Sequence, residues 1–331
     1  MLQAKTVYVT MPPNVYVHHI GDTAMKRRDF LGLTTLATGT LALNPLTGAA
    51  DSPTPPEPVE PVWVPLTKDV KTTRIGFGTG MRGWERRSDL TRLGYPKAIE
   101  MLRFAYDQGI RLFDLADLYG THDVVSEALR GKPRDSYTLV TKLWLRPGNA
   151  LPETERPDPQ ISVRRFLREL RTDYIDVVTI HCITDNRWVE DYAEPMESLE
   201  TLKKEGLIRA HGISSHSNPG TARAAEVEWG DVVLVRMNSE GDHMDGPRDN
   251  PTARVEETLR TTKLAHEAGK GIICMKVLGQ GTMEDNPELR KKSTTFIAQL
   301  DCVDTMIVGF SELGHISEFI ANVKAAERQA G

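Results

Sequence analysis

The sequence predicts an α/β fold of the (β/α)8, or TIM barrel, type, and two features carry this prediction. Eight segments between about residue 74 and residue 328 alternate between strand-like and helix-like patterns. Four residues whose side chains can hold or transfer a proton stand at or just after three of the strand-like segments: Asp114, Tyr119, Lys142 and His181. Because the carboxyl ends of parallel barrel strands meet at one mouth, where barrel enzymes place their chemistry, we expect these four side chains to lie together.

The first half of the chain predicts four strand–helix units. Glycines end the first strand, and Pro96 suits the first turn of the helix that Gly109 then stops. The run from Tyr174 to His181 is apolar and β-branched, as expected for a strand buried on both faces. The expected strands are 73–80, 111–115, 137–143 and 174–181, and the expected helices are 96–108, 123–129, 161–170 and 195–204.

The second half repeats the alternation. The expected strands are 208–214, 232–238, 272–278 and 305–309, and the expected helices are 221–227, 255–268, 289–300 and 316–326. Eight such units with right-handed crossovers close a parallel sheet into one barrel. We therefore assign residues 70–331 to a single barrel domain, since about 260 residues suit one barrel better than two domains.

Composition narrows the class of protein. The chain has 331 residues, 39% of them hydrophobic and 26% charged, with a formal net charge of −5. This balance is typical of a globular protein with a sizeable core and argues against nucleic acid as the main partner. The three cysteines, Cys182, Cys274 and Cys302, have neither disulfide-framework nor CxxC spacing, so we expect reduced, buried thiols and no metal site.

Residues 1–50 have the pattern of an export leader. Arg27 and Arg28 precede a weakly apolar stretch that ends in small residues at positions 48–50. This resembles a twin-arginine signal, whose pathway carries folded proteins, and it makes Met25 the expected start and the periplasm the expected location. The stretch is too short and too rich in Thr and Gly for a membrane span. Residues 51–69, rich in Pro and Glu, are expected to form an extended tether and the entry to the barrel.

The four strand-end residues suit the reduction of a carbonyl group. Tyrosine, with an ordinary pKa near 10, needs help to act as an acid or base near neutrality. We expect the ammonium of Lys142 to lower the pKa of Tyr119 and the carboxylate of Asp114 to hold that lysine. His181 can then form a hydrogen bond with the substrate carbonyl.

At this point the sequence resembles the aldo-keto reductase family. FDLADLYG is similar to the family pattern in which Asp and Tyr lie five residues apart, and RELRTDYIDVVTIH and LKKEGLIRAHGISSH are similar to later family segments. The resemblance covers nearly all of the expected barrel. It implies a nicotinamide-dependent oxidoreductase in which Asp114, Tyr119, Lys142 and His181 form the catalytic tetrad, with a small carbonyl compound as substrate.

The same resemblance implies a site for NADP or NAD. Its expected residues are Gly78, Thr79, Ser214, Ser215, Arg236, Asn238, Lys276, Gly279, Gly281, Gly309, Ser311 and Asn322. Two positions depart from the family: Ser215 replaces a usual Asn, and Met237 stands where one branch has a Tyr that stacks on the nicotinamide. Glu318 falls near the family's basic residue for the 2′-phosphate, where a carboxylate would favour NAD.

Two other readings of the same residues stay open. A barrel with these departures can bind a nicotinamide cofactor without turnover, as a redox sensor or as a subunit of another enzyme. A Schiff-base aldolase with Lys142 or Lys276 as nucleophile is the other reading. The tryptophans Trp84, Trp144 and Trp188 are candidates for lining a substrate pocket, with core packing as the alternative.

Overall fold

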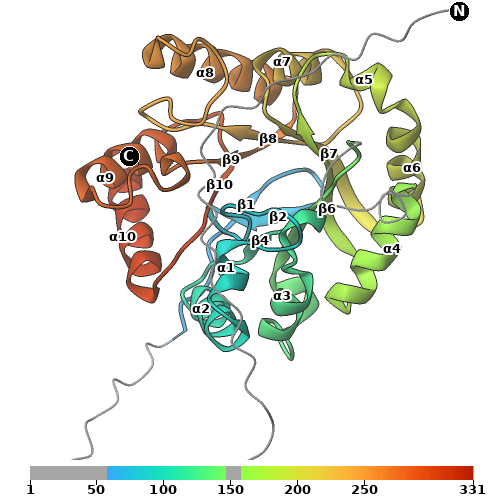
Figure 1. Cartoon of the computed structure of the whole chain (residues 1–331), viewed down its shortest axis with the longest axis horizontal. Coiled ribbons are helices and arrows are strands. Elements are labelled where there is room, and N and C mark those ends of the chain that lie inside the picture. The colour runs from blue at the N-terminus through green and yellow to red at the C-terminus, as the bar shows by residue number, and fades with distance from the viewer. Residues whose placement is uncertain (1–57, 147–157, 331) are drawn as a thin grey trace, which may run out of the picture. The chain divides into compact units, whose positions relative to one another are not determined.

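The computed structural model describes residues 58–146 and 158–330. Eight strands form a closed barrel in which every neighbouring pair is parallel, in the order β10-β3-β4-β5-β6-β7-β8-β9 (Figure 1). The strands are β3 (Ile75–Gly78), β4 (Leu112–Asp114), β5 (Thr138–Leu143), β6 (Ile175–Ile183), β7 (Ile208–Ser215), β8 (Val232–Arg236), β9 (Gly271–Met275) and β10 (Thr305–Val308). The predicted (β/α)8 barrel is confirmed.

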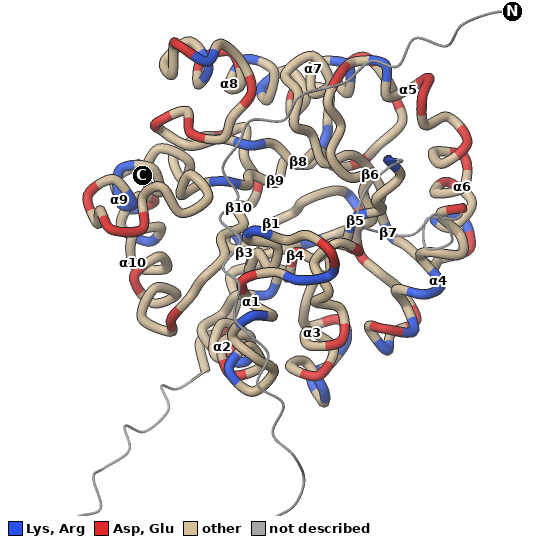
Figure 2. Tube along the Cα trace, viewed as in Figure 1, with Lys and Arg blue, Asp and Glu red and all other residues tan. Residues whose placement is uncertain are grey.

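Helices surround the barrel in the predicted sequence of units. They are α1 (Asp89–Arg92), α2 (Tyr95–Asp107), α3 (His122–Ala128), α4 (Pro159–Leu170), α5 (Trp188–Asp191), α6 (Ala193–Lys204), α7 (Asn218–Glu226), α8 (Pro251–Glu267), α9 (Pro287–Ala298) and α10 (Leu313–Ala330). Acidic and basic residues mix along these outer helices, as Figure 2 shows. None of the helices in the described residues is both long enough and apolar enough to cross a membrane.

The differences from the predicted boundaries have local causes. Helices α7 and α8 begin earlier than predicted because Ser217 and Asn250 cap their first turns with side-chain oxygens. Strand β9 ends at Met275 because Lys276 takes the left-handed backbone conformation, with φ of 62°. The short helices α1 and α5, four residues each, were not predicted.

A hairpin closes the amino-terminal end of the barrel. Strand β1 (Trp63–Pro65) pairs antiparallel with β2 (Lys71–Thr73), and Leu66 and Val70 pack against the apolar side chains inside the barrel. The prediction of an extended tether through residue 65 is therefore wrong for β1, because pairing with β2 and the burial of Leu66 give this segment a fixed place. The predicted leader, residues 1–50, lies outside the described residues.

The interior of the barrel follows the alternation of its strands. Leu112, Val140, Val177, Ala210, Val232, Leu234, Ile273, Met275 and Ile307 form one apolar cluster inside the barrel, whereas the intervening side chains pack against the helices. Because side chains of a strand alternate between its two faces, the interior position nearest the carboxyl end of each strand can be assigned. We call these eight positions the mouth layer: Gly78, Asp114, Lys142, His181, Ser214, Arg236, Met275 and Gly309.

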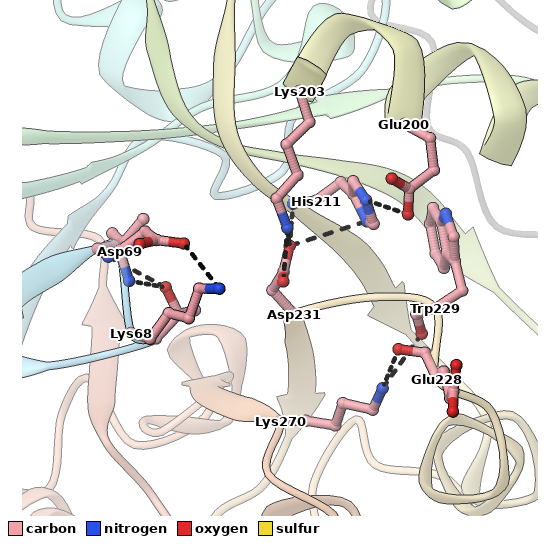
Figure 3. Close-up of polar contacts among 11 residues, drawn as sticks. Lys68, Asp69, Glu200, Lys203, His211, Glu228, Trp229, Asp231 and Lys270 are labelled. Carbon is pink, nitrogen blue, oxygen red and sulfur yellow. Dashed lines mark hydrogen bonds and ion pairs between the residues drawn. The ribbon is translucent and has the colours of Figure 1, made fainter. Parts of the chain in front are cut away.

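An outward-facing polar cluster ties β7 to α6 and β8 (Figure 3). The buried His211 ring stacks on Trp229 with centroids 4.5 Å apart, and its Nε2 lies 3.0 Å from Oε1 of Glu200. Asp231 accepts from the backbone amide of His211 at 3.0 Å and from Lys203 at 2.6 Å. These contacts belong to the packing of helix against barrel, and the strand residues predicted for catalysis, Asp114, Lys142 and His181, face the other side of the strands.

Candidate active site

The mouth layer is divided into a polar half and a small or apolar half. Five consecutive strands, β4 to β8, contribute Asp114, Lys142, His181, Ser214 and Arg236, whereas β9, β10 and β3 contribute Met275, Gly309 and Gly78. The polar half brings together side chains that can move protons. The other half leaves open space at the centre of the mouth.

Lys142 and Asp114 form a buried ion pair at the centre of the polar half. The ammonium contacts Oδ1 of Asp114 and donates to the carbonyl oxygen of Leu115 at 2.8 Å. Both side chains are almost completely buried. Burial raises the pKa of Asp114 and lowers that of Lys142, and the attraction between the two charges opposes both shifts. The structure thus places the predicted lysine–carboxylate pair where the sequence located it.

Tyr119 reaches this pair from a short 3₁₀ turn, η1 (Asp117–Tyr119), that follows β4. The Lys142 ammonium lies 5.1 Å from the centroid of the Tyr119 ring. The pKa of Tyr119 is nevertheless raised well above its usual value, first by burial and then by Asp114. The prediction that Lys142 lowers this pKa is wrong, because desolvation of the phenol and the negative charge of Asp114 raise it. Tyr119 therefore holds its proton at neutral pH.

His181 lies beside the phenol. Its Nε2 is 3.4 Å from the Tyr119 hydroxyl, and the Trp144 ring meets its edge with centroids 5.3 Å apart. Burial, followed by repulsion from Lys142, lowers the pKa of His181 well below its usual value, so the ring is neutral near pH 7. The β6–β7 ladder is irregular between Ile180 and Ile183, and Cys182 adopts φ of 64° there. This bulge ends the regular strand just where His181 meets the site.

A cavity of about 390 Å³ opens over the small half of the mouth layer. Its walls come from the ends of β3, β9 and β10, from α1 and from the first turns of α10. Asp114 and Tyr119 also border it, so the cavity reaches the proton donor. The predicted cofactor residues that line it are Gly78, Thr79, Lys276, Gly281, Gly309, Ser311 and Asn322.

The other predicted cofactor residues lie outside this cavity. Ser215 donates to the carbonyl oxygen of Ser217 at 2.8 Å and accepts from Thr221, and Asn238 binds the backbone of Asp242 and Lys276. These contacts give both side chains a structural task. Gly279 forms a turn whose amide donates to the Lys276 carbonyl oxygen. Ser214 and Arg236 belong instead to the polar half of the mouth layer.

The cavity fits part of a nicotinamide dinucleotide. Its volume is in the range of ordinary ligand pockets. At its floor the facing glycines leave no room for larger side chains, since a β-carbon on Gly309 would lie 3.2 Å from the carbonyl oxygen of Gly78. Ser214 does not line the cavity, but its buried Oγ, in the polar half of the same mouth layer, has no partner among the described residues. Such an atom is expected to meet a ligand or water, and a carboxamide group would satisfy it.

Glu318 lines the far end of the cavity, where Arg290 neutralises it. Nε and Nη2 of Arg290 donate to the two carboxylate oxygens at 2.9 and 3.0 Å. Hydrogen bonds from Arg290 lower the pKa of Glu318. Arg290 is a site residue that sequence reasoning missed, because it lies on α9 and only the fold brings it to α10.

The three tryptophans predicted as candidates for a substrate pocket lie in different parts of the structure. The ring of Trp84 meets that of Trp144 with centroids 5.5 Å apart, and Trp144 contacts His181, so these two form a wall beside the polar half. Trp188 is buried and donates to the carbonyl oxygen of Gly220 at 3.1 Å, as a packing residue does. Cys182, with Sγ 3.4 Å from Nδ1 of His216, was not predicted at the site, although it follows His181 directly.

Comparison with known proteins gives partial matches to curated sequences. A methylglyoxal reductase from Escherichia coli O157:H7, DkgB, is 34% identical over 131 residues, which are 39% of this chain and 46% of the relative. The chain spans about half the length of several curated relatives that it matches.

Solved structures show the same fold over most of the chain. A putative aldo-keto reductase from Pseudomonas aeruginosa is 24% identical and has a TM-score of 0.64, covering 82% of this chain and 97% of its own. An aldo-keto reductase from Klebsiella pneumoniae in complex with NADPH is 20% identical with a TM-score of 0.59, covering 82% and 95%. The model of the aldo/keto reductase family matches residues 74–325, and the chain belongs to that family.

Proposed function

We propose that this protein is an NAD(P)-dependent reductase of small aldehydes or ketones, including sugar carbonyls. The observation that carries the proposal is the convergence of Asp114, Lys142, Tyr119 and His181 beside a cavity suited to a nicotinamide cofactor. Family membership and relatives named methylglyoxal reductases support the reaction class.

The chain's own groups supply the proton and the orientation. When bound, the cofactor supplies a hydride to the carbonyl carbon. Tyr119, protonated at neutral pH, donates its hydroxyl proton to the carbonyl oxygen as negative charge develops there. The Lys142 ammonium, held by Asp114, stabilises the phenolate that remains. The neutral imidazole of His181 is placed to orient the carbonyl oxygen against the tyrosine hydroxyl.

The test is turnover by Tyr119→Phe. We expect kcat for methylglyoxal, followed by NADPH or NADH oxidation, to fall by about 10² or more while the Kd of the cofactor stays nearly unchanged. Tyr137→Phe is the matched control, since Tyr137 lies at the opposite end of β5 from Lys142. A loss of less than tenfold in Tyr119→Phe would remove this residue from the role of acid.

A Schiff-base reaction at Lys276 remains the second candidate. Burial, followed by repulsion from Arg236, lowers the pKa of Lys276 to about 8, so a fraction of its amine is uncharged near neutrality. Lys142, in contrast, is held in its ion pair. Borohydride trapping of a carbonyl substrate on Lys276 would favour this reaction. A bound nicotinamide without turnover of any carbonyl would instead favour a sensor.

We also propose that the protein is exported to the periplasm by the twin-arginine route with its cofactor already bound. The support is the sequence of residues 25–50, together with the scarcity of free nicotinamide cofactors outside the cytoplasm. The exported form, purified without added cofactor, should contain near-stoichiometric nicotinamide by mass spectrometry after denaturation. An empty site with micromolar affinity would contradict the scheme.

A further inference from the structure

Arg236 occupies a place in the mouth layer that the proton-transfer scheme does not use. Val232 and Leu234 face the barrel interior, so Arg236, two residues on, faces the same side at the carboxyl end of β8. It pairs in register with Met275 on β9, which lines the cofactor cavity, yet Arg236 itself lies outside that cavity. Its guanidinium therefore belongs to the polar half, with Ser214 and His181.

Arg236 forms no ion pair among the described residues, although Asp245 lies near it and lines the same small cavity. Nη2 donates to the carbonyl oxygen of His216 at 2.9 Å, and the buried Nε meets no acceptor in that part of the chain. Asp245 is the carboxylate that acts on it, but Asp245 accepts from the Asn218 amide at 2.6 Å and forms no ion pair with Arg236. A half-buried guanidinium without an ion pair can gain stability from an anionic group that a ligand supplies.

Lys276 is a second such cation at the same mouth. Its ammonium donates to Oε1 of Gln280 at 2.6 Å and has no ion pair within the described ranges. Repulsion between Arg236 and Lys276 contributes to the low pKa of Lys276. Both cations also act on His216, whose pKa burial and these charges lower to about 3. The two positive groups thus flank one small region, and His216 stays neutral within it.

Contacts connect this region to the proton donor. Nδ1 of His216 lies 3.4 Å from Sγ of Cys182, the residue after His181, and Nε2 of His181 lies 3.4 Å from the Tyr119 hydroxyl. Arg236, which donates to the His216 carbonyl oxygen, is thus linked through His216 and Cys182 to the residue that lies beside the Tyr119 hydroxyl.

We propose that Arg236, assisted by Lys276, binds a carboxylate of the substrate, so that the preferred substrates are small oxo acids and aldehyde acids. A guanidinium matches a carboxylate with two parallel hydrogen bonds, and partial burial strengthens the attraction. The inference rests on the proposed carbonyl reduction. The other source of an anion is the cofactor pyrophosphate. Lys276 lines the cofactor cavity and is within reach of either anion, whereas the position of Arg236 outside that cavity favours the substrate.

The experiment compares 4-oxobutanoate with butanal, which have the same chain length and differ in the carboxylate. For the wild-type protein we expect kcat/KM to favour 4-oxobutanoate by at least about tenfold, the scale of one charge-assisted hydrogen bond. In Arg236→Leu this preference should fall at least tenfold, mainly through KM, and Arg236→Lys should restore part of it. Arg187→Leu, which removes an exposed charge on the N-cap of α5, is the control for net charge.

The outcomes distinguish a substrate carboxylate from the cofactor pyrophosphate as the anion that Arg236 binds, and they separate this proposal from the proposed reductase function. A Kd for NADPH that rises with Arg236→Leu while the substrate preference is kept would assign the residue to the cofactor and overturn the proposal. Equal kcat/KM for the two substrates in the wild-type protein would also overturn it, even if Arg236→Leu does not fold. Turnover of neither substrate, nor of methylglyoxal, would instead contradict the proposed reductase function.

Discussion

Gly80 lies against the ring of Tyr119 so closely that a β-carbon at position 80 would come within 2.2 Å of Cε2. The loop after β3 therefore packs directly against the ring of Tyr119, the proposed proton donor. Gly83, in the same loop, would bring a β-carbon to 2.4 Å from Cδ1 of the same ring.

Gly80→Ala should displace Tyr119. Because a shift of about 1 Å at a reacting group can cost about 10² in rate, we expect kcat to fall by that order. Gly314→Ala is the control, since a β-carbon there meets nothing within 4 Å. Steady-state kinetics with circular dichroism decide the matter: full activity in folded Gly80→Ala would show that the ring has another position from which to act.

Lys142→Met should damage stability as well as catalysis. The substitution leaves the Asp114 carboxylate buried without its cation, a loss of about 3–5 kcal/mol in the free energy of unfolding. Asp114→Asn combined with Lys142→Met should recover part of that loss without recovering turnover. Urea denaturation of the two single variants and the double variant measures the coupling. Additive losses would mean that the pair is not coupled.

Acid should destabilise the fold through its buried histidines. The folded-state pKa values of His181, His211 and His216 are lowered by burial, that of His216 to about 3. Below about pH 6.5 the unfolded chain therefore binds protons that the folded chain does not. The free energy of unfolding is thus highest above that pH and decreases as the pH falls toward 3. The loss approaches about 1.4 kcal/mol per pH unit for each histidine in the window.

Urea titrations between pH 7.5 and 5 measure this slope. His216→Gln should flatten it, whereas the exposed His243→Gln serves as the control. A wild-type stability that stays constant over this range would contradict the assignment of neutral, buried rings.

Cofactor choice should depend on Glu318 and Arg290. We expect the wild-type protein to bind NAD(H) at least as tightly as NADP(H), because Glu318 occupies the guanidinium of Arg290 that would otherwise be free to bind a 2′-phosphate. Glu318→Arg should shift the ratio toward NADP(H) by about 1–2 kcal/mol. Fluorescence titration with both cofactors, with the exposed Glu288→Arg as control, gives the ratio. A clear NADPH preference in the wild-type protein would reverse this assignment.

Much of this site could be predicted from the sequence because the barrel topology determines which strand ends are neighbours. The side chains at the ends of consecutive strands must meet, so Asp114, Lys142 and His181 could be placed together without any knowledge of their contacts. The elements themselves followed from periodicity, and the errors fall at ends that depend on capping residues or on one backbone angle, as at Lys276.

What could not be predicted depends on long-range packing. The raised pKa of Tyr119 results from burial by loops, and the partner of Glu318 comes from a neighbouring helix. Ser215, which replaces a usual Asn, and Asn238 stand at family positions for the cofactor, but neighbouring groups of the chain occupy both side chains. A residue type at a family position therefore indicates a place in the fold more securely than it indicates a contact.

The division of the mouth layer has a consequence for how such a protein can change over time. Glycines and Met275 on β9, β10 and β3 border the proposed cofactor cavity, whereas the groups proposed to meet a substrate stand on β4 to β8. Substitutions at position 236 and its neighbours can alter which molecule is accepted while the opposite arc of strands keeps its shape. Natural selection can then change the substrate specificity without changing the residues that border the proposed cofactor cavity.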